Sequence, residues 1–241
     1  MRHLPRILRP LPFDGVEFEP PVSTKFYGAG IEAPELVRRA FAELAREELK
    51  AFLLAIGLGL RRREADHLQW RSFDFVNGTV RVQPTEYYEL KTVESAAVLK
   101  FDPEFMALFK GWYAKARGAF VLESERPPRP ATNYHYYRAA TTFDRLVEWL
   151  RLQGVRGNKP LHTCRKIYGS LIADKFGIHA ALSALRHTTI DLTSAVYADR
   201  SMKFESGLGS VISGAELLAF PSSRSSKTVR ARANRRVGAK Q

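Results

Sequence analysis

The sequence predicts an α+β domain, mainly α-helical, in which a small three-stranded antiparallel sheet interrupts a series of helices. Apolar residues recur at helical spacing in several long stretches of the 241-residue chain. One pair of short β-rich runs is joined by Asn77-Gly78, which is a strong hairpin signal. Helices that precede and follow a small antiparallel sheet, rather than alternate with its strands, are typical of the α+β class.

The N-terminal third is expected to contain an arm and one long helix. Residues 1–32 are rich in proline and glycine and show no sustained period, so we expect an extended arm. A long amphipathic helix should begin at Pro34 and end at Gly57 and Gly59, with a short helix soon after. The apolar positions of the long helix are Val37, Phe41, Leu44, Leu49, Phe52, Leu53 and Ile56.

The sheet should follow in the FDFVNGTVRV stretch. A type I′ turn at Asn77-Gly78 would join its first two strands, and a third strand is expected at about residues 96–101. Lys91-Thr92 would then lie in the connection between the second and third strands. Asp102 is expected to cap the next helix, which begins at Pro103.

Helices are also predicted in the C-terminal half. After a proline-rich loop at 123–133, one helix should run from about His135 to Gln153, and others should begin at Leu161. A stripe that contains Cys164 and Tyr168 marks the buried face, and His162, Arg165 and Gly169 fall roughly opposite it. The polar pair is therefore expected to face away from the core. The basic tail at 221–241 is expected to be disordered.

Composition limits the classes of function. The formal charge is +13, and seven of these positive charges lie in residues 222–241, which leaves +6 for the rest. This excess favours a polyanionic partner such as nucleic acid only weakly. The single cysteine, Cys164, excludes an internal disulfide and a cysteine-rich zinc module, and it fits a reducing compartment. No run of about 18 apolar residues is present, so we expect a cytoplasmic protein without a membrane span.

Five motifs together resemble the catalytic domain of the tyrosine recombinase (phage integrase) family. They are GLRRRE at 59–64, the Lys91-Thr92 turn, HTCR at 162–165, LRH at 185–187 and the tyrosine of AVYAD at 195–199. The resemblance covers roughly residues 33–200 and implies a catalytic domain at 33–220. Residues 1–32 would then be an arm or the remnant of a core-binding domain.

The resemblance implies roles for seven residues. Arg61 and Arg165 would hold the non-bridging oxygens of a DNA phosphodiester, with Glu64 as the orienting acid. Tyr197 would be the nucleophile that forms a 3′-phosphotyrosyl bond. The remaining implied roles belong to His162 as base or orienter, His187 as a hydrogen-bond donor to phosphate, and Lys91 as general acid. No metal, ATP or other cofactor is implied.

Double-stranded DNA is the implied partner, bound by a homotetramer on recombination sites and by a chain that is monomeric when free. Arg62, Arg63 and Lys166 are candidates for contacts with its phosphates. Arg186 departs from the pattern, because the family usually has glycine before the histidine. Two alternatives stay open: relaxation of DNA in the manner of a type IB topoisomerase, and a DNA-binding integrase fragment without catalysis.

Overall fold

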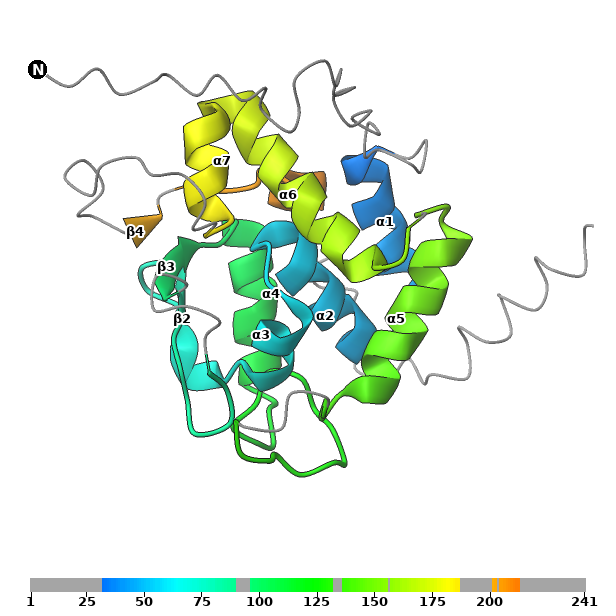
Figure 1. The fold of residues 1–241 in the computed structure, drawn as a ribbon, viewed down its shortest axis with the longest axis vertical. Helices are drawn as coiled ribbons and strands as arrows, with labels where there is room; N and C mark the ends of the chain where they lie inside the picture. Colours follow the sequence, from blue (N-terminus) through cyan, green and yellow to red (C-terminus); the bar gives the residue numbers. More distant parts are fainter. Residues whose placement is uncertain are drawn as a thin grey trace, which may run out of the picture.

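A buried central helix, α2 (Arg46–Gly57), organises the fold, and every residue from Glu48 to Gly57 is buried. The computed structural model describes residues 32–89, 96–131, 136–155, 157–186, 201–202 and 204–212. Of the other helices in the described chain, all but the last pack against α2, and the last packs against α6 (Figure 1). They are α1 (Ala33–Glu43), α3 (Arg62–His67), α4 (Pro103–Tyr113), α5 (Ala140–Leu152), α6 (Pro160–Phe176) and α7 (Ile178–Ala184). The mainly helical α+β class is confirmed.

The first predicted helix is in fact two helices, α1 and α2. Leu44 and Ala45 have extended backbone, with ψ angles of 146° and 166°. The break explains the one irregular step in the apolar pattern, from Leu44 to Leu49. Five residues at 100° each would turn Leu49 about 140° away from Leu44 on a continuous helix. With the break, both side chains are buried.

The sheet contains β1 (Phe73–Asp74), β2 (Thr79–Val82), β3 (Ala97–Lys100) and β4 (Ser201–Met202) in that order. The first three strands are antiparallel, as predicted, and β4 adds a parallel two-residue edge to β3. The β1–β2 connection was predicted wrongly as a type I′ turn. Gly78 has a φ of 65°, but Asn77 does not have a positive φ. Asp74 instead accepts the N–H groups of Val76 and Asn77, which stabilises a four-residue loop.

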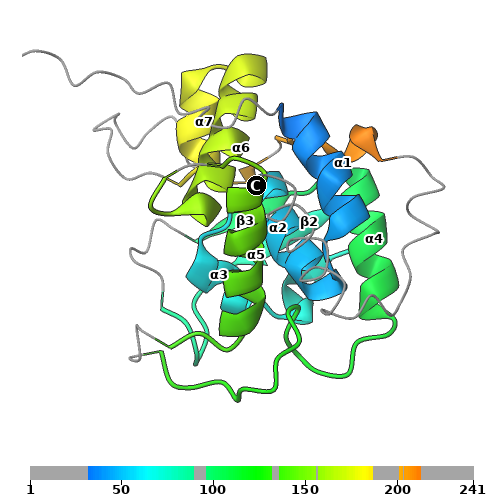
Figure 2. The same cartoon turned by 90° about the vertical axis from the view of Figure 1, so that its right-hand side faces the viewer.

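The side chain of Asp102 does not cap α4, contrary to the prediction. Its carboxylate accepts the Ser206 hydroxyl at 2.6 Å and the Gly209 N–H at 2.8 Å. This buried carboxylate therefore fastens the segment after β4 to the start of α4, where the 3₁₀ turn η3 (Gly209–Val211) lies (Figure 2).

Helix α5 begins at Ala140 rather than near residue 135, and His135 itself lies outside the described residues. The fully buried Asp66 of α3 accepts the N–H groups of Arg138 and Ala139, each at 2.8 Å. A carboxylate from another helix thus satisfies the two backbone donors that immediately precede α5. This contact also fixes α3, and with it the residues just before α3, against the helical body. Among the described residues, no helix has the length and apolar character needed to cross a membrane.

Candidate functional site

The site is organised around Glu64, a carboxylate that is 2% exposed on the short helix α3. Arg61 is the N-cap residue of α3. One oxygen of Glu64, Oε2, accepts the backbone N–H of Arg61 at 2.8 Å, and Oε1 accepts Nη1 of the same arginine at 2.8 Å. The Arg61 side chain is 33% exposed. It therefore reaches solvent in an orientation that its own helical turn fixes.

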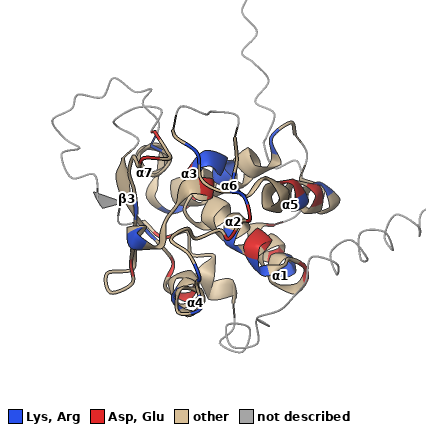
Figure 3. Cartoon of the chain, turned by 90° about the horizontal axis from the view of Figure 1, so that it is seen from below, with Lys and Arg blue, Asp and Glu red and all other residues tan. Residues whose placement is uncertain are grey.

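Arg165 reaches the same place from α6. Its Nη1 donates to the carbonyl of Gly59, 106 positions earlier in the chain, and its Nη2 donates to the carbonyl of Leu185. The GLRRRE and HTCR motifs, far apart in sequence, thus meet at one loop. In Figure 3, which looks along the vertical axis of Figure 1, Lys and Arg positions (blue) are drawn where α3 and α6 overlap in projection.

The prediction that Arg165 and Gly169 face away from the core was wrong. Arg165 is 1% exposed and Gly169 is buried. Helix α7 covers this face of α6, and a Cβ on Gly169 would lie 2.5 Å from a methyl carbon of Leu185. A helical wheel identifies one apolar stripe, but it cannot show that a second helix packs against the opposite face and offers the carbonyl of its C-cap residue, Leu185, to a guanidinium.

Arg186 is a third arginine in this cluster, and the motifs assigned it no role. Its Nη2 donates to Oε2 of Glu64 at 2.7 Å and lies 3.5 Å from the carbonyl oxygen of Gly59. The side chain is buried. Its backbone has a φ of 51°, and it is the one residue other than glycine with positive φ in the described chain. The sequence contained one sign of a special residue at position 186: an arginine stands where the family usually has glycine.

Gly59 is required by both backbone geometry and packing. Its φ is 59°, and a Cβ there would lie 2.5 Å from Cδ1 of Tyr168. This close approach places the Gly59 carbonyl oxygen within reach of both Arg165 and Arg186. The glycine of the GLRRRE motif therefore serves to present an acceptor to two arginines.

The cluster holds more positive than negative charge. Burial alone would raise the pKa of Glu64, but Arg186, the N–H and guanidinium of Arg61, and Arg165 together lower it. Burial and then the neighbouring guanidiniums of Arg186 and Arg61 lower the pKa of Arg165 to about 9. Three guanidiniums around one carboxylate leave a net charge of +2 in a poorly solvated place. Such a cluster is suited to an anion that brings compensating charge.

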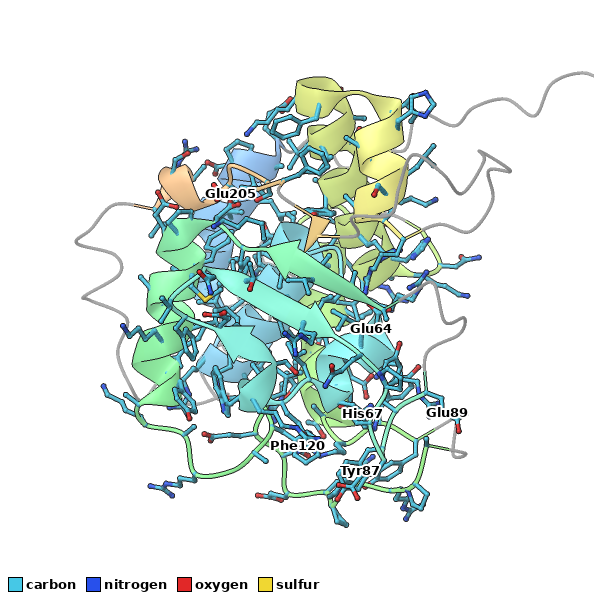
Figure 4. All side chains as sticks on the ribbon, turned by 90° about the vertical axis from the view of Figure 1, so that its left-hand side faces the viewer. Glu64, His67, Tyr87, Glu89, Phe120 and Glu205 are labelled. Carbon is cyan, nitrogen blue, oxygen red and sulfur yellow. The ribbon has the colours of Figure 1, made fainter. Side chains whose placement is uncertain are left out.

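Tyr88 completes the surroundings of Glu64, and the sequence patterns did not identify it. Its hydroxyl donates to Oε1 of Glu64 at 3.4 Å. Burial, and then the charge of Glu64, raises the pKa of Tyr88. The ring stacks on His67 with centroids 6.1 Å apart. Figure 4 labels Glu64 and His67, both on α3.

The remaining predicted residues on α3 and α6 differ in exposure. His162 and Lys166 are exposed on α6. Arg62 contacts Asp144 at 3.3 Å and lies over the ring of Tyr137, 4.3 Å from its centroid. Arg63 donates through Nη2 to the carbonyl of Ala131. Both arginines are thus held against the protein, and their contact with DNA stays a prediction.

Three of the predicted catalytic residues, Lys91, His187 and Tyr197, lie outside the described residues. Lys100, at the end of β3, donates to the carbonyl of Asn77 at 2.9 Å in the hairpin loop. Cys164 is fully buried, which confirms its predicted place on the buried stripe, and burial raises the pKa of its thiol to about 12. In the ranges that the structure describes, no cluster of three or more His, Cys, Asp or Glu residues could hold a metal ion.

The comparisons with known proteins give only distant similarities. No family model matches the chain, and no curated protein matches it. Solved structures that resemble it include a fragment of the Tn1549 transposon integrase in complex with circular intermediate DNA, at 17% identity and a TM-score of 0.47. A variant of that fragment with transposon right end DNA also has 17% identity, with a TM-score of 0.49. The alignments cover 86% of this chain and 68% and 65% of the two integrase chains.

Proposed function

We propose that the chain is a DNA strand transferase of the tyrosine recombinase type, which cleaves and rejoins DNA through a 3′-phosphotyrosyl intermediate. The observation that carries this proposal is the cluster of Arg61 and Arg165 around Glu64 and Gly59. The two arginines come from distant motifs and meet at the loop that begins at Gly59, in a cluster with excess positive charge that could bind a phosphate. The motif tyrosine and histidine downstream supply the groups that such a site would need for transfer.

The proposed chemistry balances without metal or ATP. The Tyr197 oxygen attacks the scissile phosphorus and gives up its proton, for which His162 is the candidate acceptor. The bond from phosphorus to the 5′ oxygen breaks, and Lys91 donates a proton to that leaving oxygen. Rejoining is the reverse: a 5′-hydroxyl attacks the phosphotyrosine and restores the phenol. The energy of the phosphodiester is kept in the covalent bond throughout.

Negative charge on the two non-bridging oxygens grows in the transition state, and this is where the arginines act. Arg61, Arg165 and the candidate donor His187 would bind these oxygens. The net charge of +2 in the cluster would compensate the doubly negative five-coordinate phosphorus. Because Arg61 is already held by Glu64 and Arg165 by Gly59, little further reorganisation is needed at the moment of reaction, once the phosphate has reached both groups.

Access to Arg165 requires a local opening, because this residue is 1% exposed. Two of its five N–H donors bond to carbonyl groups, one before α3 and one at the end of α7. We propose that bound DNA moves the end of α7 and exchanges the Leu185 carbonyl for a phosphate oxygen. A change in amide exchange at the end of α7 when DNA is added, with exchange in the middle of α6 unaltered, would support this step.

The DNA partner would be held mainly through its phosphates. Lys166 is exposed on α6, whereas Arg62 and Arg63 are half-buried on α3, so we expect Lys166 to contribute the most of these three cationic candidates. We further propose that residues 33–220 act as the catalytic unit, and that four chains assemble on recombination sites from free monomers.

A trapping experiment tests the function on a pool of DNA sites rather than on a single one. Nicked duplexes with randomised sequence beside the nick are incubated with the protein. Cleavage next to the nick releases a short strand, which leaves the protein covalently joined to DNA. Adducts are recovered on a denaturing gel and sequenced, with Tyr197→Phe as the control. An adduct that this variant lacks supports the proposal.

The same preparations separate the two alternatives. Relaxation of supercoiled plasmid at many unrelated sequences, with no preferred site in the pool, would identify a topoisomerase-like activity. Binding of duplex DNA with no adduct in the wild-type chain would identify a DNA-binding protein without catalysis. Formation of the adduct by Tyr197→Phe would show that another residue is the nucleophile.

A further inference from the structure

Arg186 contacts the acceptor groups that hold Arg61 and Arg165, the two arginines that bind the phosphate in the proposed function. It is the one described residue within hydrogen-bond distance of both the Glu64 carboxylate, which holds Arg61, and the Gly59 carbonyl, which holds Arg165. We propose that Arg186 is a positioning residue, which sets the orientation of Arg61 and Arg165 and supplies part of the excess positive charge of the cluster. This inference rests on the proposed function.

The backbone supports a role beyond filling space. A residue other than glycine in the left-handed region is uncommon, and a long side chain gains nothing from that conformation by itself. Arg186 nevertheless holds a φ of 51°, where a glycine would fit without strain. The contact with Glu64, at 2.7 Å and with both side chains almost fully buried, is what this conformation makes possible.

The guanidinium also has donors to spare. Nε and Nη1 of Arg186 are buried and have no hydrogen-bond partner among the described residues, although Nη2 has two acceptors. Buried donors without acceptors are costly, and native structures keep them where a ligand or a functional constraint accounts for them. Here the extra charge beside Arg165 increases the demand of the cluster for an anion. A phosphodiester bound by Arg61 and Arg165 would meet that demand.

Two substitutions separate the side chain from the backbone. Arg186→Gly removes the guanidinium and relieves the positive φ, whereas Arg186→Asn removes it and keeps a residue that tolerates this region. Single-turnover cleavage of the trapped substrate should fall about 100-fold in both variants, since a misplaced phosphate-holding group costs about that much. The Kd for DNA should change less than about threefold, because a buried residue makes no contact with the duplex surface. Arg186→Lys should keep part of the activity.

Chemical rescue gives a readout that a merely structural role would not move. Guanidinium ion added at low millimolar concentration should restore cleavage to Arg186→Gly, whose cavity can accept it, and should leave the wild type unchanged. Glu64→Gln removes this ion pair, together with the one between Glu64 and Arg61, without altering the chain beside His187. The double variant Arg186→Gly/Glu64→Gln should therefore cleave no more slowly than the worse single variant. Additive losses would show that Arg186 does not act through Glu64.

Failure of this inference can be told apart from failure of the proposed function. If the wild type forms an adduct and both Arg186→Gly and Arg186→Asn cleave within about twofold of it, Arg186 is not a positioning residue. If the wild type forms no adduct, the proposed function fails. In that case ¹⁵N spectra of the arginine side chains test whether Arg186 orients Arg61 and Arg165. Slowed guanidinium rotation of Arg61 and Arg165 should then be lost in Arg186→Gly. Its persistence would overturn the inference.

Discussion

Replacing Glu64 by glutamine should destabilise the protein far more than its near-identical shape suggests. Glu64 accepts from Arg61 Nη1 at 2.8 Å, from the Arg61 backbone N–H at 2.8 Å and from Arg186 Nη2 at 2.7 Å. Both oxygens of Glu64 accept hydrogen bonds, so the NH₂ group of a glutamine must face at least one of these N–H donors, with which it cannot form a hydrogen bond. Breaking a buried ion pair and leaving a charge without compensation costs about 3–5 kcal/mol, so we expect the free energy of unfolding to fall by that amount.

Urea unfolding measures this loss, with Glu35→Gln as the matched control. Glu35 also accepts hydrogen bonds from two arginines, Arg38 and Arg39, but on the exposed face of α1. Exposed pairs of this kind contribute little, so its unfolding midpoint should not change measurably. A loss below about 1 kcal/mol for Glu64→Gln, comparable to a surface pair, would refute the reasoning about the buried cluster.

The difference between wild type and Glu64→Gln should also depend on pH in a defined direction. The folded-state pKa of Glu64 is lowered, so its contribution is complete above the unfolded value of about 4.3 and is lost as pH falls through the folded value. The difference in stability should stay constant from pH 7 to about pH 5 and narrow below that. A difference that narrows as pH rises would contradict the assigned cause.

Three further outcomes follow from the packing. Gly59→Ala should lower the free energy of unfolding by about 2–4 kcal/mol, because the alanine would have to hold a positive φ and its Cβ would clash with Tyr168. The control is Gly111→Ala on α4, whose Cβ would meet nothing within 4 Å. It should raise the free energy of unfolding by about 0.5–1 kcal/mol. Cys164, with its raised pKa and full burial, should react with a thiol reagent only at the rate of global unfolding, and fast labelling of the native protein would contradict this. Asp102→Ala should speed amide exchange in residues 206–209 and leave α6 unchanged, and unaltered exchange in that segment would show that Asp102 does not hold it.

Local sequence patterns predicted most of the elements, because apolar periodicity and turn residues act within a few positions. The hairpin strands, the short helix after Gly59 and the helix that begins at Pro103 all depend on such local signals. The break between α1 and α2 was missed although the pattern contained it, as a step of five from Leu44 to Leu49. Neither Leu44 nor Ala45 is a glycine or proline, so the usual helix-breaking residues do not mark the break.

Long-range contacts limited what could be predicted for the site. The motifs identified Arg61, Glu64 and Arg165, and the structure brings these three together. The sequence could not show that Asp102 serves a distant segment rather than its own helix, or that two carbonyl groups hold Arg165. Arg186 was visible only as a departure from the family pattern. Its contact with Glu64 joins residues that lie 122 positions apart in the chain.

The central claim is that fixed guanidiniums stabilise negative charge on a phosphate during transfer, and a neutral phosphate tests it most directly. A trapping substrate with a methylphosphonate at the scissile position lacks one negative oxygen, so it should need Arg165 far less. Arg165→Ala should therefore lose cleavage of the ordinary phosphodiester by about 100-fold or more, retain most of its DNA affinity, and recover cleavage on the methylphosphonate. An equal loss on both substrates, or a parallel loss of DNA affinity, would contradict the assigned role.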